Sequence, residues 1–335
     1  MIKEKIKKNL PIILVLIVAA VVFVVLPLLG QYRIKHGQLK KYTDSQMDEY
    51  YYGKFTKTNR IYKDGKMLSE IGEYEFEPKA IAKADTCIFA LDKQSCCIFS
   101  INNEGEIIKK VGGIGNGRLE FLNPEDITFA NDKLYVLDSQ NERIEILSDD
   151  LEYLDEIKLP EKSNKYKTLN SIAVDDKENV FMSCSDVGYS AVLVYVKEKA
   201  EFREFGKNFK GTLCSDNGEV YAITVGSVFE SKSEKRIGWR SGFNDLYSVS
   251  VNGINRLCEL PYASTILDFV ITNGKIICFN GCYRTIDTFG TDGKYLYSFS
   301  NIGGEDVDKS CIWIDNLGNI YVGYQNKILH YGDSL

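Results

Sequence analysis

The sequence predicts an all-β fold, a six-bladed β-propeller with four-stranded blades, preceded by one N-terminal transmembrane helix. Three observations support this prediction. A strand-like unit recurs six times, a turn-forming segment precedes each copy, and a run of twenty uncharged residues stands near the N-terminus. The 335 residues are 44% hydrophobic and 26% charged, a composition typical of a globular protein rather than a disordered one.

The recurring unit is an apolar and aromatic strand. Its copies are CIFALD (87–92), LYVLD (134–138), VFMSC (180–184), VYAIT (220–224), IICFN (276–280) and IYVGY (320–324). Equivalent positions in successive copies are 46, 46, 40, 56 and 44 residues apart. A period of ~40–50 residues is the length of one four-stranded propeller blade.

A hairpin turn precedes each of these strands. The turns are rich in Asn, Asp and Gly, as in Asn131-Asp132-Lys133 and Asp216-Asn217-Gly218. These residue types tolerate the positive φ angles that tight hairpins need. The Asp-rich turns could also suit Ca²⁺, but none has the EF-hand pattern. We therefore interpret them as hairpins and expect no metal and no cofactor.

The last blade is predicted to borrow a strand from the other end of the chain. Residues 310–331 supply three strands only, whereas the hairpin-like segment YKDGKMLSEIG (62–72) has no strands before it. We expect residues 67–71 to add the outer strand of the last blade. This arrangement removes two exposed strand edges and closes the ring, so that the propeller occupies residues 57–335.

The N-terminal residues are predicted to tether the propeller to a membrane. Residues 10–29 carry no charge, and as a helix they would span roughly 30 Å, the thickness of a bilayer core. A tail with four lysines, residues 1–9, precedes them, and a stalk, residues 30–56, follows. A cleaved signal peptide is the alternative, but it would have a shorter apolar region and a small-residue cleavage site.

The side of the membrane is open to two interpretations. The lysines before the helix favour a cytoplasmic tail and an extracytoplasmic propeller, which is the topology we expect for this single-pass protein. The nine cysteines favour the opposite side, because an odd number leaves a free thiol. Six of them lie in or beside apolar strands and are expected to be buried: Cys87, Cys96, Cys97, Cys184, Cys278 and Cys311.

The second unit, residues 112–147, has the densest motif. Its characteristic residues are Gly113, Gly115, Gly117, Phe121, Pro124, Tyr135-Val136, Asp138-Ser139, Asn141 and Arg143-Ile144. This unit resembles an NHL repeat, and the whole soluble part is similar to six-bladed NHL or TolB-like propellers. The resemblance implies that Asp138, Asn141 and Arg143 hold the blade together.

By analogy with such propellers, a ligand would bind at one face, around the central channel. That face is built from the loops that enter the innermost strands and the loops that join the second and third strands. Candidate binding residues there are Asp126, Asn170, Tyr189, Asp268, Tyr283 and Tyr324. Their carboxylates, amide and phenols suit a polar or sugar-like ligand, although they also suit bulk water.

The fourth unit carries an insertion on the same face, residues 227–244. It contains Trp239 and Arg240, residue types enriched at interaction hot spots. Long insertions in compact domains are often functional. The alternative is a surface loop in which Trp239 packs on its own blade.

The composition limits the classes of function. The net charge is −6, and an acidic protein is a poor partner for nucleic acid. The only histidines, His36 and His330, are too few for a zinc lyase or a Ser–His–Asp site. We expect a non-enzymatic binding or protein-interaction scaffold module, with membrane lipid around residues 10–29 and a protein or carbohydrate ligand at the propeller face.

Two alternative functions remain. A metal-dependent hydrolase or lactonase-like enzyme would use the channel carboxylates, with Glu125, Asn170 and Asp268 as its ligand set. An accessory subunit of a larger membrane complex would use the propeller to contact other proteins.

Overall fold

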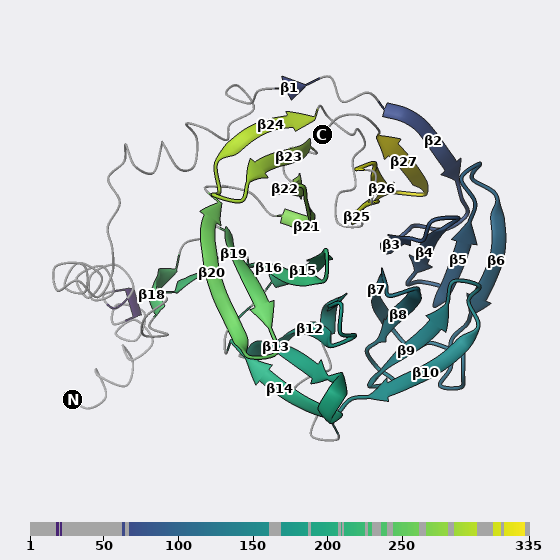
Figure 1. Ribbon diagram of the computed structural model, residues 1–335, viewed down its shortest axis with the longest axis horizontal. Coiled ribbons are helices and arrows are strands. Elements are labelled where there is room, and N and C mark those ends of the chain that lie inside the picture. Colours follow the sequence, from purple (N-terminus) through teal and green to yellow (C-terminus); the bar gives the residue numbers. More distant parts are fainter. Residues whose placement is uncertain are drawn as a thin grey trace, which may run out of the picture.

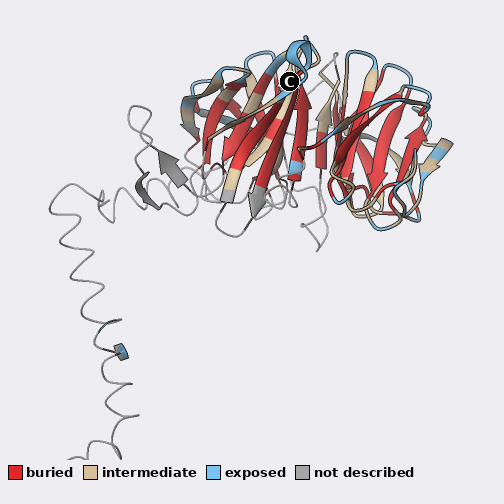
Figure 2. Ribbon diagram, turned by 90° about the horizontal axis from the view of Figure 1, so that it is seen from below, coloured by how far each residue is buried: buried red, intermediate tan, exposed pale blue. Residues whose placement is uncertain are grey.

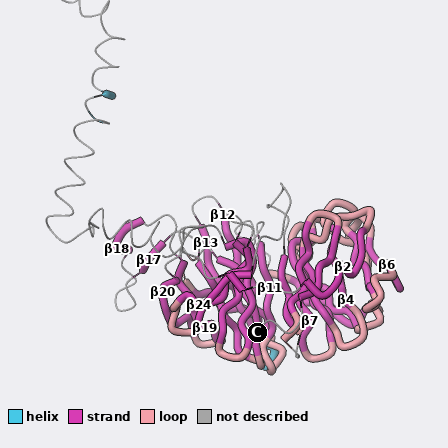
Figure 3. Tube along the Cα trace, turned by 90° about the horizontal axis from the view of Figure 1, so that it is seen from above, coloured by secondary structure: helices cyan, strands magenta, loops and turns pink. Residues whose placement is uncertain are grey.

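The computed structural model is a ring of six β-sheets (Figure 1). It describes residues 18–19, 21, 62–63, 67–160, 169–186, 189–206, 209, 211–224, 227–229, 236–239, 244–260, 266–280, 285–299, 311–315 and 318–331. The strands run between two loop-bearing faces of the ring (Figure 3). The predicted fold class, an all-β six-bladed propeller of four-stranded blades, is confirmed.

The first three blades are regular antiparallel sheets, with their strands in chain order from the centre outward. Blade 1 contains β3 (Ala80–Lys83), β4 (Ile88–Asp92), β5 (Cys97–Ile101) and β6 (Ile107–Gly112). Blade 2 contains β7 (Pro124–Ala130), β8 (Lys133–Asp138), β9 (Arg143–Ser148) and β10 (Tyr153–Lys158). Blade 3 contains β11 (Leu169–Val174), β12 (Val180–Asp186), β13 (Tyr189–Val196) and β14 (Glu201–Phe205), with a short 3-10 helix at Lys197–Lys199.

The next two blades carry additions. Blade 4 contains β15 (Gly211–Asp216), β16 (Glu219–Thr224), β19 (Asn244–Ser250) and β20 (Gly253–Leu260). Between its second and third strands, β17 (Ser227–Phe229) and β18 (Arg236–Trp239) pair as a separate hairpin. Blade 5 contains β21 (Ile266–Thr272), β22 (Lys275–Asn280), β23 (Thr285–Gly290) and β24 (Tyr295–Phe299).

Blade 6 closes the ring in the predicted way. Its inner strands are β25 (Cys311–Ile314), β26 (Ile320–Tyr324) and β27 (Lys327–Tyr331). The outer strand is β2 (Met67–Glu73), which pairs antiparallel with β27. The sequence did not indicate β1 (Tyr62–Lys63), which pairs parallel with β24. The N-terminal part of the propeller therefore attaches to two neighbouring blades.

The strands are mostly buried and the loops that join them are more exposed (Figure 2). The hydrophobic clusters join residues of neighbouring blades. The strand β4 is buried along its whole length. Phe89 packs in a cluster with residues of blade 2, whereas Ile88 and Ala90 pack in a cluster with residues of blade 6. Because both faces of such a strand are covered, its sequence is uniformly apolar. This double burial explains why the second strand of each blade gives the repeat signal.

The predicted hairpin turns that lie within the described residues are confirmed, and so is the burial of the six thiols. Asn131 and Asp132, between β7 and β8, have φ angles of 52° and 57°. The six cysteines expected in the core are buried, and all eight cysteines within the described ranges are free thiols. Burial raises the pKa of the Cys184 thiol to about 11, which keeps it protonated and unreactive at neutral pH.

Most of the N-terminal prediction lies outside the described residues. Of the predicted membrane segment, residues 10–29, only positions 18, 19 and 21 are described, and the tail and stalk are outside. Within the described ranges, none of the helices has both the length and the apolar character needed to cross a bilayer.

Candidate binding site in the central channel

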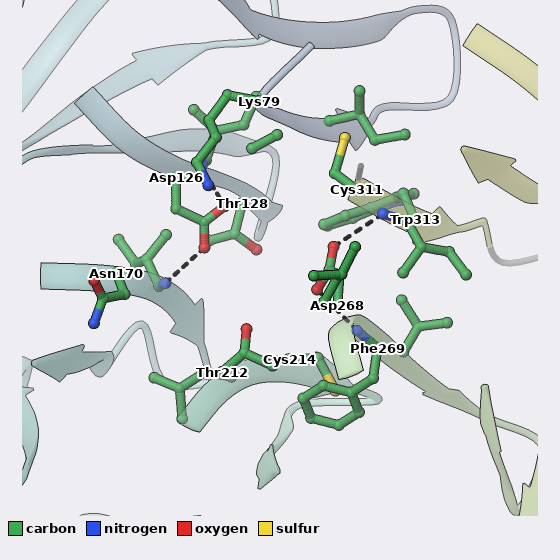
Figure 4. Close-up of a pocket in the computed structure, with 18 of the residues that line it drawn as sticks. Lys79, Asp126, Thr128, Asn170, Thr212, Cys214, Asp268, Phe269, Cys311 and Trp313 are labelled. Atoms are coloured by element: carbon green, nitrogen blue, oxygen red, sulfur yellow. Dashed lines mark hydrogen bonds between the residues drawn. The ribbon is translucent and has the colours of Figure 1, made fainter. Parts of the chain in front are cut away.

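The wall of the central channel is formed by the first strand of each blade. These strands are β3, β7, β11, β15, β21 and β25, and they surround a cavity of about 110 Å³ (Figure 4). One buried water needs roughly 10–15 Å³ of such volume, whereas ligand pockets commonly measure about 300–1,000 Å³. The cavity therefore has room for several waters or one small polar group.

One layer of this wall contains structurally equivalent residues from all six blades. Each member pairs in register with the equivalent residue of its blade's second strand, as Asp126 does with Leu137 and Asp268 with Phe279. In chain order the layer consists of Ala80, Asp126, Ser171, Thr212, Asp268 and Cys311. Asp126 belongs to blade 2 and Asp268 to blade 5, so the two carboxylates face each other across the ring (Figure 4).

Both aspartates hold the neighbouring blade through a backbone hydrogen bond. Asp126 Oδ2 accepts from the Ile172 N–H at 2.9 Å, and Oδ1 accepts from the Ile127 N–H at 2.9 Å. Asp268 Oδ2 accepts from the Ile312 N–H at 2.9 Å, and Oδ1 accepts from the Phe269 N–H at 2.9 Å. The same geometry thus recurs on opposite sides of the channel.

A serine makes the equivalent interblade bond in blade 3. Ser171 Oγ accepts from the Leu213 N–H at 3.1 Å, and it is also within 3.3 Å of Thr212 Oγ1. Like the two aspartates, Ser171 follows a register shift at the start of its strand. A neutral side chain with one acceptor is therefore sufficient for this interblade bond.

The channel environment raises the pKa values of both carboxyl groups. Burial is the largest cause for Asp126, whose pKa rises to about 6 despite its backbone hydrogen bonds. Burial also dominates for Asp268, whose pKa rises to about 7 with a further contribution from the negative charge of Asp126. Lys79 lowers both values slightly. Between about pH 6 and pH 7 both carboxyl groups therefore change from the neutral to the ionised form.

Three further polar side chains of the wall stand next to this layer in the sequence. Lys79, Glu125 and Asn170 line the cavity, each one residue before a member of the layer. Glu125 Oε1 forms an ion pair with Lys93 Nζ at 2.6 Å and accepts from Asn123 Nδ2 at 2.7 Å. Among the described residues, no group of three or more His, Cys, Asp or Glu side chains is arranged to hold a metal.

The structure brings together three of the predicted binding residues, namely Asp126, Asn170 and Asp268. It places Tyr324 elsewhere. That side chain is 5% exposed and packs with the core between blades 5 and 6, because β26 is a second strand covered on both faces. Tyr189 and Trp239 lie on strands but their side chains are outside the described part, as are Tyr283 and Arg240 altogether.

The residues of the NHL-like motif form a buried network within blade 2. Asp138 accepts from Asn141 Nδ2 at 2.7 Å, from Arg143 Nε at 3.0 Å and from the Leu122 N–H at 2.8 Å. Arg143 also donates to the carbonyls of Gly117 and Glu120. These bonds attach the loop before β7 to β8 and β9. The network lies away from the cavity lining.

Thr212, Cys214 and Trp313 also line the channel and were not singled out by the sequence. A positional signal was available for Thr212. Each member of the layer stands eleven or twelve residues before its partner in the recurring strand, as the pairs Asp126–Leu137 and Ser171–Ser183 show. Thr212 stands eleven residues before Ile223 of VYAIT, at the same interval as Asp126 before Leu137.

The fold and channel define the class of protein, a six-bladed β-propeller with a small polar cavity. Residues 73–190 match a family described as a 6-bladed beta-propeller, DUF5128. The match covers 118 of the 335 residues, from the end of β2 into blade 3. None of the curated proteins matches the sequence. The finer resemblance of residues 112–147 to an NHL repeat stays a prediction.

Several solved structures share this fold. A candidate gluconolactonase has a TM-score of 0.56 at 9% identity, covering 82% of this chain and 95% of its own. Virginiamycin B lyase from Staphylococcus aureus has a TM-score of 0.51 at 12% identity, covering 78% and 97%. An auxiliary nutrient binding protein from Bacteroides thetaiotaomicron has a TM-score of 0.52 at 11% identity, covering 80% and 69%. At these identities the likeness shows the fold alone.

Proposed function

We propose that this chain is a binding module that receives a polar group of its ligand between Asp126 and Asp268. The observation that carries the proposal is the presence of carboxylates at these two positions. The interblade bond needs one acceptor, and Ser171 supplies it without charge. Aspartate leaves additional acceptor capacity and a titrating pair in the channel. Buried carboxyl groups with shifted pKa values are concentrated at functional sites.

The chemistry of the pair suits a hydroxyl or ammonium group. An ionised carboxylate accepts from either group, and a protonated one can also donate to a hydroxyl. The small volume of the cavity means that only one such group would enter it. The rest of the ligand, a carbohydrate or a protein segment, would lie on the surrounding face, where we predicted roles for Tyr189 and Tyr283.

Replacement of both aspartates by serine tests this proposal. The variant Asp126→Ser/Asp268→Ser copies the solution that blade 3 already uses, so it keeps an interblade acceptor and removes the charge. Thermal shifts of the full-length protein would be measured against neutral hexoses, hexosamines and short oligosaccharides. A ligand at 100 times its Kd stabilises the folded state by about 2.7 kcal/mol. Wild type should show such a shift and the variant should lose it; equal shifts in both proteins would refute the channel site.

A metal-dependent hydrolase is the second candidate function, because Glu125, Asn170 and Asp268 all line the cavity. Glu125 is already paired with Lys93, so metal binding would have to compete with that ion pair. Elemental analysis of protein purified without chelators distinguishes the two functions. Stoichiometric Ca²⁺ or Zn²⁺ that disappears in Asp268→Ser would favour the hydrolase over the binding module.

The β17–β18 hairpin supports a further role in contacting another protein, such as a larger membrane complex. This hairpin pairs only with itself and lies outside the ring of blades (Figure 1). Its second strand ends at Trp239, and Arg240 is the next residue in the sequence. The variant Trp239→Ala/Arg240→Ala should fold normally and lose partners in copurification from native membranes. An unchanged set of copurifying proteins would exclude this role.

The proposed location is the outer side of a cell membrane, with residues 10–29 as a single-pass anchor. The support is the length of the uncharged segment and the lysines before it. Protease added to intact cells should remove the propeller. Complete protection of the propeller, with release only after lysis, would reverse the topology.

A further inference from the structure

A second and larger cavity lies at the opposite end of the innermost strands. Its volume is about 750 Å³, within the range of about 300–1,000 Å³ that small-molecule sites occupy. Its walls come from blades 6, 1 and 2, including the turns that follow β3 and β7. Trp313 and Ile314 line both this cavity and the central channel, so the two cavities are neighbours at the end of β25.

The lining of this second cavity is strongly acidic. Four carboxylates belong to it, from Asp85, Asp132, Asp149 and Asp315, and Lys83 supplies the one ammonium group among the described lining residues. Their formal charges add to −4 + 1 = −3. His330 also lines the cavity, but burial lowers its pKa, so the imidazole is neutral at neutral pH. The electrostatic field of the cavity therefore favours a cation.

The position of Lys83 shows how the wall accommodates an ammonium group. Its Nζ lies 5.6 Å from the centroid of the Tyr321 ring and donates to the carbonyl oxygens of Ala84 and Asp85 at 3.0 and 3.3 Å. Tyr321 is held in place by its hydroxyl, which donates to Asp315 at 3.2 Å, and by the His330 ring stacked at 4.7 Å. An aromatic face bordered by oxygen acceptors is a favourable environment for an organic cation.

Further apolar and aromatic surface is available beside this arrangement. Trp313 and Phe129 line the cavity and are only half-buried. Asp85 and Asp132 are exposed at the tips of neighbouring turns. Within the described part of the chain neither carboxylate has an ion-pair partner. A ligand with an aliphatic body and a positive end would cover the aromatic surface and neutralise these charges.

We propose that this cavity binds an aliphatic organic cation, a guanidinium or primary ammonium group on a short alkyl chain. The site is separate from the channel aspartates, so it does not depend on the proposed function of the channel. A free amine and a basic side chain of a peptide share this chemistry. Cation–π contact and the carboxylates supply the attraction, and the alkyl chain buries apolar surface.

Tryptophan fluorescence gives a direct test with the full-length protein. The chain has two tryptophans, so Trp239→Phe leaves Trp313 as the only one. We expect a saturable change in its emission with n-butylguanidinium and none with its neutral isostere n-butylurea. A second arm uses acetyl-Gly-Arg-Gly-amide: equal affinity would assign the site to a peptide side chain, and much weaker affinity to a free amine. Equal responses to the cation and to the urea would overturn the proposal.

Charge variants in the Trp239→Phe protein make the test specific. Asp85→Asn/Asp132→Asn should weaken n-butylguanidinium binding roughly threefold to tenfold, as expected for partly screened charges. Lys83→Gln should strengthen it, a direction that general structural damage would not produce. Asp155→Asn, an exposed carboxylate on β10, and the channel variant Asp126→Ser/Asp268→Ser should leave affinity unchanged. Weaker binding by Lys83→Gln, or an unchanged affinity in Asp85→Asn/Asp132→Asn, would refute the site.

Discussion

The channel aspartates should make the propeller less stable as the pH rises from about 4 to 7. A carboxyl group whose pKa is higher in the folded chain than in the unfolded chain holds its proton more tightly when folded. Asp126 and Asp268 titrate at about 6 and about 7, against a usual value of 3.8. Their contribution to stability is therefore greatest below pH 4, falls between about pH 4 and 7, and is constant above that range.

The size of the effect follows from the pKa shifts. One pKa unit corresponds to about 1.4 kcal/mol, so the rise of the Asp126 pKa from 3.8 to about 6 corresponds to about 3 kcal/mol. The rise of the Asp268 pKa to about 7 corresponds to about 4 kcal/mol. Part of the second shift arises from the charge of Asp126, so the two contributions are not additive. We expect a total change of about 3–6 kcal/mol over this pH range.

Urea unfolding followed by far-UV circular dichroism, from pH 4.5 to pH 8, measures this change. Other groups titrate too, so the informative quantity is the difference in unfolding free energy between wild type and Asp126→Ser/Asp268→Ser. Serine has one side-chain oxygen, so one of the two backbone N–H groups at each site loses its acceptor. This loss costs about 1 kcal/mol at each site and does not vary with pH. The variant should therefore be less stable than wild type at low pH and gain on it steadily toward pH 8. Parallel pH profiles for the two proteins would show that the carboxylates do not titrate in this way.

Three further predictions concern the propeller scaffold. Gly105→Ala should destabilise the propeller by about 2 kcal/mol or more. At this position φ is +89°, and a Cβ would lie 1.8 Å from the Ile71 carbonyl oxygen. The control Gly274→Ala, at φ +70° with open space around it, should cost only about 1 kcal/mol in the same urea titration. Arg143→Met should lower the unfolding free energy by about 3–5 kcal/mol, because it leaves the buried carboxylates of Asp138 and Glu145 without their cation. A loss below about 1 kcal/mol would contradict a stabilising role for this network. The six buried thiols should resist Ellman's reagent in the native protein and react after denaturation. The chain has nine cysteines, so rapid labelling of more than three of them in the native protein would contradict this burial.

The sequence predicted the blades because one strand in each is covered on both sides. The run Ile88–Asp92 is fully buried, and so is Ile320–Tyr324, and this double burial imposes the recurring apolar pattern. The outer strands carry a weaker signal, since β6 alternates between exposed and half-buried residues. The strand β1 has two residues and is specified by its partner β24 rather than by its own composition. Ring closure was predictable because an unpaired hairpin strand and an incomplete blade stood at opposite ends of the chain.

The channel site was only partly predictable. Asp126 and Asp268 could be placed at the channel because each stands where the chain was expected to enter the innermost strand of its blade. The structure puts both within that strand rather than in the loop before it. The sequence could not predict that these two carboxylates face each other, because this depends on blades 2 and 5 standing opposite each other in the closed ring. Tyr324 was expected on the binding face because it ends a recurring strand. Side chains alternate along a strand, and this alternation directs the Tyr324 side chain into the core between blades 5 and 6.

The acidic cavity on the other face was not visible in the sequence, for a physical reason. Asp85 and Asp132 lie in turns that the sequence predicts one at a time as hairpins, and both turns do join paired strands. Asp315 follows β25, which pairs with β26 in the same way. Aspartate is common in such turns for local backbone reasons, so a single example carries no functional information. The ring brings the three turns around Trp313 and Tyr321, so that their carboxylates line one cavity. A repeat fold can therefore build a site from residues whose local role is structural, and the reversed response predicted for Lys83→Gln distinguishes such a site from a group of ordinary turns.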